Sequence, residues 1–217
     1  MTAGGALKRR DVVARLLRDR QGLAVVTGLG SATYDAAATG DHPRNFYLWG
    51  AMGGTAMVGL GVALAQPRLP VLVLTGDGDM LMGLGSLATI GAQNPPNLAI
   101  AVLDNGRYGE TGGQASHTAK GTDLAAVARA CGIAEASVIA DEAALEGFVT
   151  RVHRIGAGTG FAVLKVEAGE DPRVLPARDG AFLKDRFRAA IGSASGEPSR
   201  TATADGRQAR AGQDGGG

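Results

Sequence analysis

Two short polar motifs come directly after apolar runs that have the length of β-strands. Asp77 lies in a Gly-Asp-Gly triplet that follows the run 71–75, and Asn105 follows the run 98–103. The 26 residues between Gly78 and Asn105 are enough for one crossover helix, so the two strands can be parallel neighbours. Because open parallel sheets bind ligands at the carboxyl ends of their strands, we expect Asp77 and Asn105 to converge.

The side chains of these two residues suit a hard cation. Carboxylate and amide oxygens are ligands for Mg²⁺ or Ca²⁺, and Mg²⁺ commonly completes its shell with phosphate oxygens and water. Gly76 and Gly78 let the backbone approach such a phosphate, and a helix expected to begin near Met80 points its N-terminus at it. This pattern indicates a diphosphate bridged by Mg²⁺. A Gly-Asp-Gly triplet alone is equally compatible with a simple strand-to-helix turn.

The elements that position these motifs follow from hydrophobic patterning. Four runs read as strands buried on both faces, and longer helix-like segments lie between them. This alternation predicts an α/β fold: a doubly wound, mostly parallel sheet with helices on both faces. The expected strands are 23–27, 71–75, 98–103 and 161–166, with shorter ones near 46–49 and 137–140. The expected helices are 8–20, 55–65, 81–92, 124–131 and 142–155.

Bulk composition limits the class of protein. The formal net charge is +1, which gives no reason to expect nucleic acid or an anionic membrane as a partner. No apolar run reaches the roughly 18 residues of a membrane span, and the cytoplasm is the default location. Cys131 is the only cysteine, so we expect a small buried residue and no intrachain disulfide. Residues 193–217 lack large apolar side chains, which predicts a folded domain over 1–192 and a disordered tail.

The combination of motifs resembles the signature of thiamine diphosphate-dependent enzymes. The segment 44–53 looks like the part of that family that bends the cofactor, and 84–90 looks like the helix after the metal loop. The segment 104–118 is especially similar to phosphonopyruvate decarboxylases and to the β subunit of sulfopyruvate decarboxylases. The similarity covers about 7–191, and it implies a diphosphate-binding domain that holds thiamine diphosphate and Mg²⁺.

The resemblance also implies roles for individual residues. Asp77 and Asn105 would bind Mg²⁺ through their side chains, and Arg107 would bind it through its backbone carbonyl. Met52 would hold the cofactor in a bent shape, with a core methionine as the alternative, and the carbonyl of Gly50 would accept a hydrogen bond from the 4′-amino group. The remaining positions expected to contact the cofactor are Ser31, Ala51, Gly76, Gly78, Asp79, Tyr108 and Gly109.

Several polar residues keep alternative interpretations. An acid at position 79 is unfavourable beside a diphosphate unless it faces away or Mg²⁺ offsets its charge. Asp79 could instead cap the following helix. His117 and Glu110 are candidates for acid–base work, or else an exposed loop histidine and a loop hydrogen-bonding group. His42 and His153 are expected at the surface. The pair Gly28 and Gly30 lacks the third glycine of a dinucleotide fingerprint, which disfavours NAD.

The resemblance further implies a partner. The glutamate that activates the cofactor in this family belongs to a pyrimidine-binding domain, for which we find no counterpart in 1–217. We therefore expect a separate pyrimidine-binding α subunit, in at least an α2β2 assembly. The expected activity is decarboxylation of a short 2-oxoacid such as sulfopyruvate or phosphonopyruvate. The alternatives are a carboligase, a thiamine-dependent aldehyde-oxidising enzyme, and a non-catalytic regulatory module that binds the cofactor.

Overall fold

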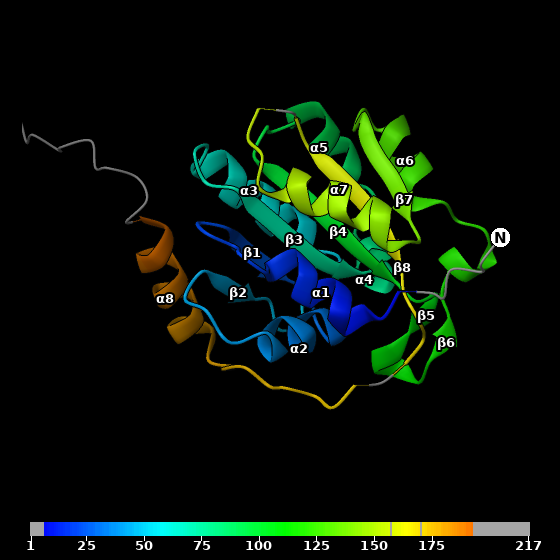
Figure 1. Cartoon of the computed structure of the whole chain (residues 1–217), viewed down its shortest axis with the longest axis horizontal. Helices are drawn as coiled ribbons and strands as arrows, with labels where there is room; N and C mark the ends of the chain where they lie inside the picture. The colour runs from blue at the N-terminus through cyan, green and yellow to red at the C-terminus, as the bar shows by residue number, and fades with distance from the viewer. Residues whose placement is uncertain (1–6, 157, 170, 193–217) are drawn as a thin grey trace, which may run out of the picture.

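The computed structural model describes residues 7–156, 158–169 and 171–192, and it contains a six-stranded parallel sheet in the order β2-β1-β3-β4-β8-β7 (Figure 1). All five neighbouring pairs are parallel, as predicted. The strands are β1 Ala24–Thr27, β2 Asn45–Tyr47, β3 Val71–Gly76, β4 Leu98–Asp104, β7 Glu135–Ile139 and β8 Gly160–Lys165. A separate antiparallel hairpin joins β5 Arg107–Tyr108 to β6 Gln114–Ala115.

Helices cover both faces of the sheet, which confirms the doubly wound architecture. On one face α1 Arg9–Leu17, α2 Ser31–Ala38 and α7 Glu142–Val152 pack over the central strands. On the other face lie α3 Thr55–Ala65, α4 Asp77–Met82, α5 Ser86–Gln93 and α6 Leu124–Ala130. The last helix, α8 Gly180–Gly192, packs against the edge strand β2. Among the described residues, no helix is long and apolar enough to span a membrane.

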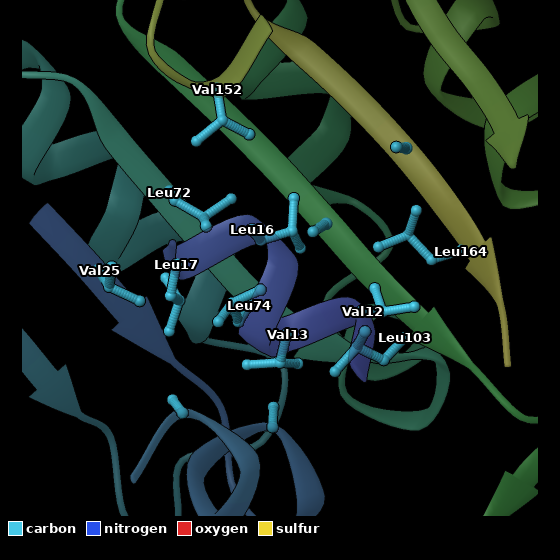
Figure 2. Close-up of a cluster of buried hydrophobic side chains, with 14 of the residues drawn as sticks. Val12, Val13, Leu16, Leu17, Val25, Leu72, Leu74, Leu103, Val152 and Leu164 are labelled. Atoms are coloured by element: carbon cyan, nitrogen blue, oxygen red, sulfur yellow. The ribbon is translucent and has the colours of Figure 1, made fainter. Parts of the chain in front are cut away.

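The first helix illustrates how sequence pattern becomes packing. Val12, Val13, Leu16 and Leu17 share one helical face, and all four are buried. In Figure 2 they lie against side chains of the sheet, among them Val25 of β1, Leu72 of β3 and Leu164 of β8. These contacts confirm the expected N-terminal helix, although it ends at Leu17 instead of residue 20.

The segment after the Gly-Asp-Gly triplet differs from the prediction. The helix begins at Asp77 and not near Met80, and the single helix expected over 81–92 is two helices, α4 and α5. The break lies beside Gly83, whose Cα packs against the backbone of Gly53 so closely that a Cβ would overlap the Gly53 carbonyl oxygen. Contact with the 50–54 loop therefore determines where the helix breaks between α4 and α5. Hydrophobic periodicity cannot predict this break, because it does not report contacts between distant segments.

Other corrections are smaller. Helix α7 ends at Val152 instead of residue 155, and both α2 and α8 are helices that the apolar pattern did not indicate. His42 and His153, expected at the surface, are partly buried, and burial lowers the pKa of each imidazole. Cys131 is partly buried and packs against the core between the sheet and the helices α3, α5 and α6. The tail expected over 193–217 lies outside the described residues.

Two helical glycines predict opposite effects on stability. A Cβ at Gly91 of α5 would overlap the carbonyl oxygen of Cys131, whereas a Cβ at Gly147 of α7 would meet no atom within 4 Å. We expect Gly91→Ala to lower the free energy of unfolding by about 1–3 kcal/mol through overpacking. Gly147→Ala should raise it by roughly 0.5–1 kcal/mol through helix propensity. Urea denaturation of both variants measures the two signs, and a stabilising Gly91→Ala would contradict this packing.

Candidate functional site

The candidate site lies where β3 and β4 end. Gly76 of β3 pairs with Leu103 of β4, so Asp77 and Asn105 follow directly neighbouring strands, as their spacing predicted. One cavity of about 100 Å³ gathers most of the residues expected at the site. Its lining includes Ser31, Met52, Gly76, Asp77, Gly78, Asp79, Asn105, Arg107, Tyr108, Gly109 and Glu110, but not Gly50, Ala51 or His117.

Asp77 is held by two hydroxyl groups on one of its carboxylate oxygens. Asp77 is only 2% exposed, and its Oδ2 accepts hydrogen bonds from Ser116 Oγ at 2.5 Å and Thr118 Oγ1 at 3.2 Å. Burial raises the pKa of the Asp77 carboxyl group, and the nearby Asp104 carboxylate acts in the same direction. Asp77 thus carries a carboxylate that two hydroxyl groups orient and that has no cationic partner in the described part of the chain.

Asp104 completes the cluster from the end of β4. Its buried carboxylate accepts hydrogen bonds from Thr118 Oγ1 at 2.7 Å and from the Gly106 backbone N–H at 3.0 Å. Lys165, the last residue of β8, places its Nζ 2.5 Å from Asp104 Oδ2. Thr118 therefore bridges two carboxylates, and Lys165 compensates the charge of the one that is farther from the cavity.

Asn105 and Arg107 are arranged by a turn between β4 and the hairpin. Asn105 Oδ1 accepts a hydrogen bond from the Arg107 backbone N–H at 2.9 Å. Gly106 between them has a φ of 70°, a conformation that favours glycine. The Arg107 guanidinium turns to the hairpin loop and donates to the Gly113 carbonyl at 3.0 Å.

Asp79 does not cap a helix, because it already lies in the first turn of α4. Its Oδ1 accepts a hydrogen bond from the Gly53 backbone N–H at 2.5 Å, and its Oδ2 accepts one from the Thr75 hydroxyl. The side chain is buried so tightly that a Cβ at Gly28 would overlap it. The carboxylate is therefore engaged with the 50–54 loop, which ties Met52 and its neighbours to α4.

Glycines bring Met52 and Tyr108 close to the triplet. A Cβ at Gly78 would lie 2.7 Å from a ring carbon of Tyr108 and 4.0 Å from Cε of Met52. Gly50 and Ala51 precede Met52 with φ values of 76° and 51°, so the loop turns in the left-handed region. This turn places the Met52 side chain in the cavity, where a core methionine would have been enclosed on all sides.

The two acid–base candidates occupy different places. Glu110 lines the cavity and packs over the start of α2, where a Cβ at Gly30 would lie 2.7 Å from Glu110 Oε1. His117 is exposed and outside the lining, but its Nδ1 lies 2.7 Å from the Tyr108 hydroxyl oxygen. His117 therefore reaches the cavity only through Tyr108.

The family assignment comes from comparison with known proteins. Residues 28–166 match the model of the thiamine pyrophosphate enzyme C-terminal TPP binding domain, which is well over half of the chain. The chain belongs to the thiamine pyrophosphate enzyme family. The matched segment begins in the loop after β1 and ends just beyond β8, so it includes every lining residue of the cavity except Arg9.

Individual relatives agree with this family. The chain is 50% identical over 127 residues to a phosphonopyruvate decarboxylase of Streptomyces viridochromogenes, covering 58% of this chain and 30% of that protein. It is 39% identical over 127 residues to the sulfopyruvate decarboxylase subunit beta of Methanocaldococcus jannaschii, covering 58% and 67%. A 2-oxoglutarate:ferredoxin oxidoreductase from Magnetococcus marinus shares the fold, with a TM-score of 0.57 at 20% identity over 71% of this chain and 60% of that one.

Burial of the Asp77 carboxylate is expected to lower the free energy of unfolding of the metal-free chain at neutral pH. Because its pKa is raised, the folded chain retains a proton that the unfolded chain releases above the ordinary carboxyl pKa. Stability therefore falls as pH rises through that window. We expect Asp77→Asn to be more stable than the wild type at pH 7 with a chelator present, and the difference to shrink below about pH 4. Thermal unfolding at both pH values measures this, and a less stable variant at pH 7 would refute it.

Proposed function

We propose that this chain is the thiamine diphosphate- and Mg²⁺-binding subunit of a two-subunit 2-oxoacid decarboxylase. The observation that carries the proposal is the meeting of Asp77, Asn105 and Met52 in one cavity at the ends of β3 and β4. Each of the three stands at a position where the family signature places a metal ligand or the residue that bends the cofactor.

The ligand set fits Mg²⁺ bound together with a diphosphate. Ser116 and Thr118 both bond Oδ2 of Asp77, so Oδ1 is the oxygen that would coordinate the cation. Asn105 Oδ1 and the Arg107 carbonyl would supply two further oxygens. Within the described ranges, no cluster of three or more His, Cys, Asp or Glu side chains could hold a metal. The remaining coordination positions would therefore fall to diphosphate oxygens and water, as Mg²⁺ prefers.

Residues in and beside this cavity suit the organic part of the cofactor. Met52 would separate and support its two rings, and its flexible thioether allows close contact with both. The Gly50 carbonyl would accept the 4′-amino hydrogen bond, and Gly76, where a Cβ would meet no atom within 4 Å, leaves space for the diphosphate beside α4. Asp79 does not oppose the diphosphate, because its carboxylate is engaged by Gly53 and Thr75. When bound, the cofactor supplies the electron sink for decarboxylation.

The acid–base groups of this chain would act at the substrate carbon that loses carbon dioxide. Glu110 lines the cavity, and its carboxylate would hold a proton for that carbon. Tyr108 lies between the cavity and His117, so a proton at the Tyr108 hydroxyl can exchange with His117 Nδ1. Ser31 begins α2, and its backbone N–H would favour an anionic group of the cofactor or the substrate.

The partner follows from the relatives. The chain spans about a third of the phosphonopyruvate decarboxylase and about two thirds of the sulfopyruvate decarboxylase subunit beta that it matches. We infer a pyrimidine-binding α subunit that contributes the catalytic glutamate in at least an α2β2 complex. The substrate would be a small 2-oxoacid of the sulfopyruvate or phosphonopyruvate type.

Metal binding is the first prediction to test. We expect Asp77→Ala and Asn105→Ala to weaken the Mg²⁺-dependent binding of thiamine diphosphate at least about tenfold, since each removes a coordinating oxygen. Calorimetric titration measures the affinity for the chain alone and mixed with the candidate α subunit. Asp185→Asn, an exposed acid on α8, is the matched control. Unchanged affinity in both site variants would refute the proposed ligands.

The proposed role of Met52 predicts that its substitution changes turnover and not cofactor affinity. Met52→Ala should bind cofactor nearly as well as the wild type but release carbon dioxide about 10- to 100-fold more slowly in the reconstituted complex, because the reacting groups lose their alignment. Met57→Ala on α3 is the control, since Met57 is 39% exposed and does not line the cavity. An unchanged rate for Met52→Ala would remove its proposed role. Release of carbon dioxide only with an added electron acceptor would favour an oxidising enzyme over a decarboxylase.

A further inference from the structure

A second, larger cavity adjoins the proposed metal site. It has a volume of about 550 Å³ and shares Ser31, Asn105, Arg107, Gly109 and Glu110 with the smaller one. Its other walls come from α1, α2, the hairpin loop and the chain after β8. The charged groups that line it are four guanidiniums and three carboxylates: Arg9, Arg10, Arg107, Arg173, Asp35, Asp171 and Glu110.

Two of the four arginines are occupied by structural ion pairs. Asp35 is fully buried in α2 and binds Arg9 Nε at 2.5 Å and Arg10 Nε at 3.0 Å. Arg9 also reaches Asp171 at 3.5 Å and the Gly169 carbonyl at 2.9 Å, and Arg10 donates to the Pro172 carbonyl at 2.8 Å. Asp35 and Asp171 thus balance Arg9 and Arg10. These contacts fix the position of the strap, which we define as residues 171–179.

The other two arginines have no carboxylate partner within the described residues. Arg173, on the strap, lies over the Tyr34 ring with its Cζ 5.5 Å from the centroid, so an aromatic face holds it. Arg107 uses one terminal nitrogen on the Gly113 carbonyl. Among the lining residues that the structure describes, Glu110 is the one carboxylate left to oppose these two charges, and it lies against the start of α2 near Gly30. The described side chains of this wall therefore carry one more positive than negative charge beside the proposed reaction site.

We propose that Arg173 and Arg107 form the subsite for a second anionic group at the far end of the substrate. The inference rests on the proposed function, and it assigns the recognition of a phosphonate or sulfonate tail to these two side chains. A substrate whose 2-oxo end lies at the Asp77–Asn105 cavity would place that tail in the adjoining cavity. A guanidinium presents paired N–H donors that match such tetrahedral oxyanions. A substrate with a methyl group in that position would leave the positive wall unpaired.

Arg173 is a better residue for a test than Arg107, because Arg107 is also a proposed metal ligand through its backbone carbonyl and Arg173 is not. The first experiment measures binding of two inert analogues, 3-phosphonopropanoate and butanoate, to the chain loaded with thiamine diphosphate and Mg²⁺. We expect the phosphonate to bind at least about tenfold more tightly than butanoate, and Arg173→Gln to remove roughly that factor. Arg173→Lys should restore part of it. Arg188→Gln, an exposed arginine on α8, is the control. Equal affinity of wild type and Arg173→Gln for the phosphonate would overturn the assignment.

The second experiment distinguishes a failure of the proposed anion subsite from a failure of the proposed decarboxylase function. In the reconstituted complex, Arg173→Gln should raise KM for sulfopyruvate or phosphonopyruvate about tenfold or more and leave KM for pyruvate nearly unchanged. A KM that rises equally for all three substrates would reject the subsite while keeping the decarboxylase. A complex that releases no carbon dioxide from any of them would reject the proposed function. The analogue titration would still decide whether Arg173 binds the anion.

Discussion

Two buried carboxylates at the ends of adjacent strands set the main constraint on this domain. Asp77 and Asp104 belong to one hydrogen-bonded cluster, and two negative charges so placed are costly unless other groups compensate them. Among the residues that the structure describes, Lys165 supplies the only side-chain cation in that cluster, and it contacts Asp104. The sheet order β3-β4-β8 makes the cluster possible, because it brings the ends of these three strands side by side. The loop that contains Ser116 and Thr118 must then fold back over them. Within the described ranges no cation contacts Asp77, and the Ser116 and Thr118 hydroxyl groups orient its carboxylate.

Much of the fold could be predicted from local pattern. The strands buried on both faces appear in the sequence as unbroken apolar runs, and the helix Thr55–Ala65 was predicted with the bounds that the structure has. The convergence of Asp77 and Asn105 followed from the spacing between two strands and the rule for parallel sheets. The parts that failed depend on contacts between distant segments. The break between α4 and α5 is set by Gly53, about thirty residues earlier in the chain, and the start of α4 at Asp77 runs against the low helix propensity of Asp and Gly.

The site itself was predicted less completely than the fold. The residues that face the cavity could be named because the family motif contains them, whereas those that hold them could not. Ser116, Thr118 and Lys165 received no role from the sequence, because hydroxyl and ammonium groups are common near strand ends and only the returning loop gives them a partner. The same applies to Arg173, whose significance depends on Asp35 satisfying Arg9 and Arg10 first. The role of a residue that positions or balances the site residues can be assigned only when all charged groups of the cavity and their partners are known.

The contact between Asp79 and Gly28 has a consequence for how such sequences can change. The Asp79 carboxylate fills the space that a side chain at residue 28 would need, and it also binds the backbone at Gly53. Positions 28 and 79 lie in different segments of the chain, yet they cannot vary independently. A smaller residue at 79 would free space for a side chain at 28 and remove the carboxylate that accepts the Gly53 backbone N–H. Divergence along this lineage would therefore be expected to replace positions 28 and 79 together, as a correlated pair within an otherwise unchanged cofactor cavity.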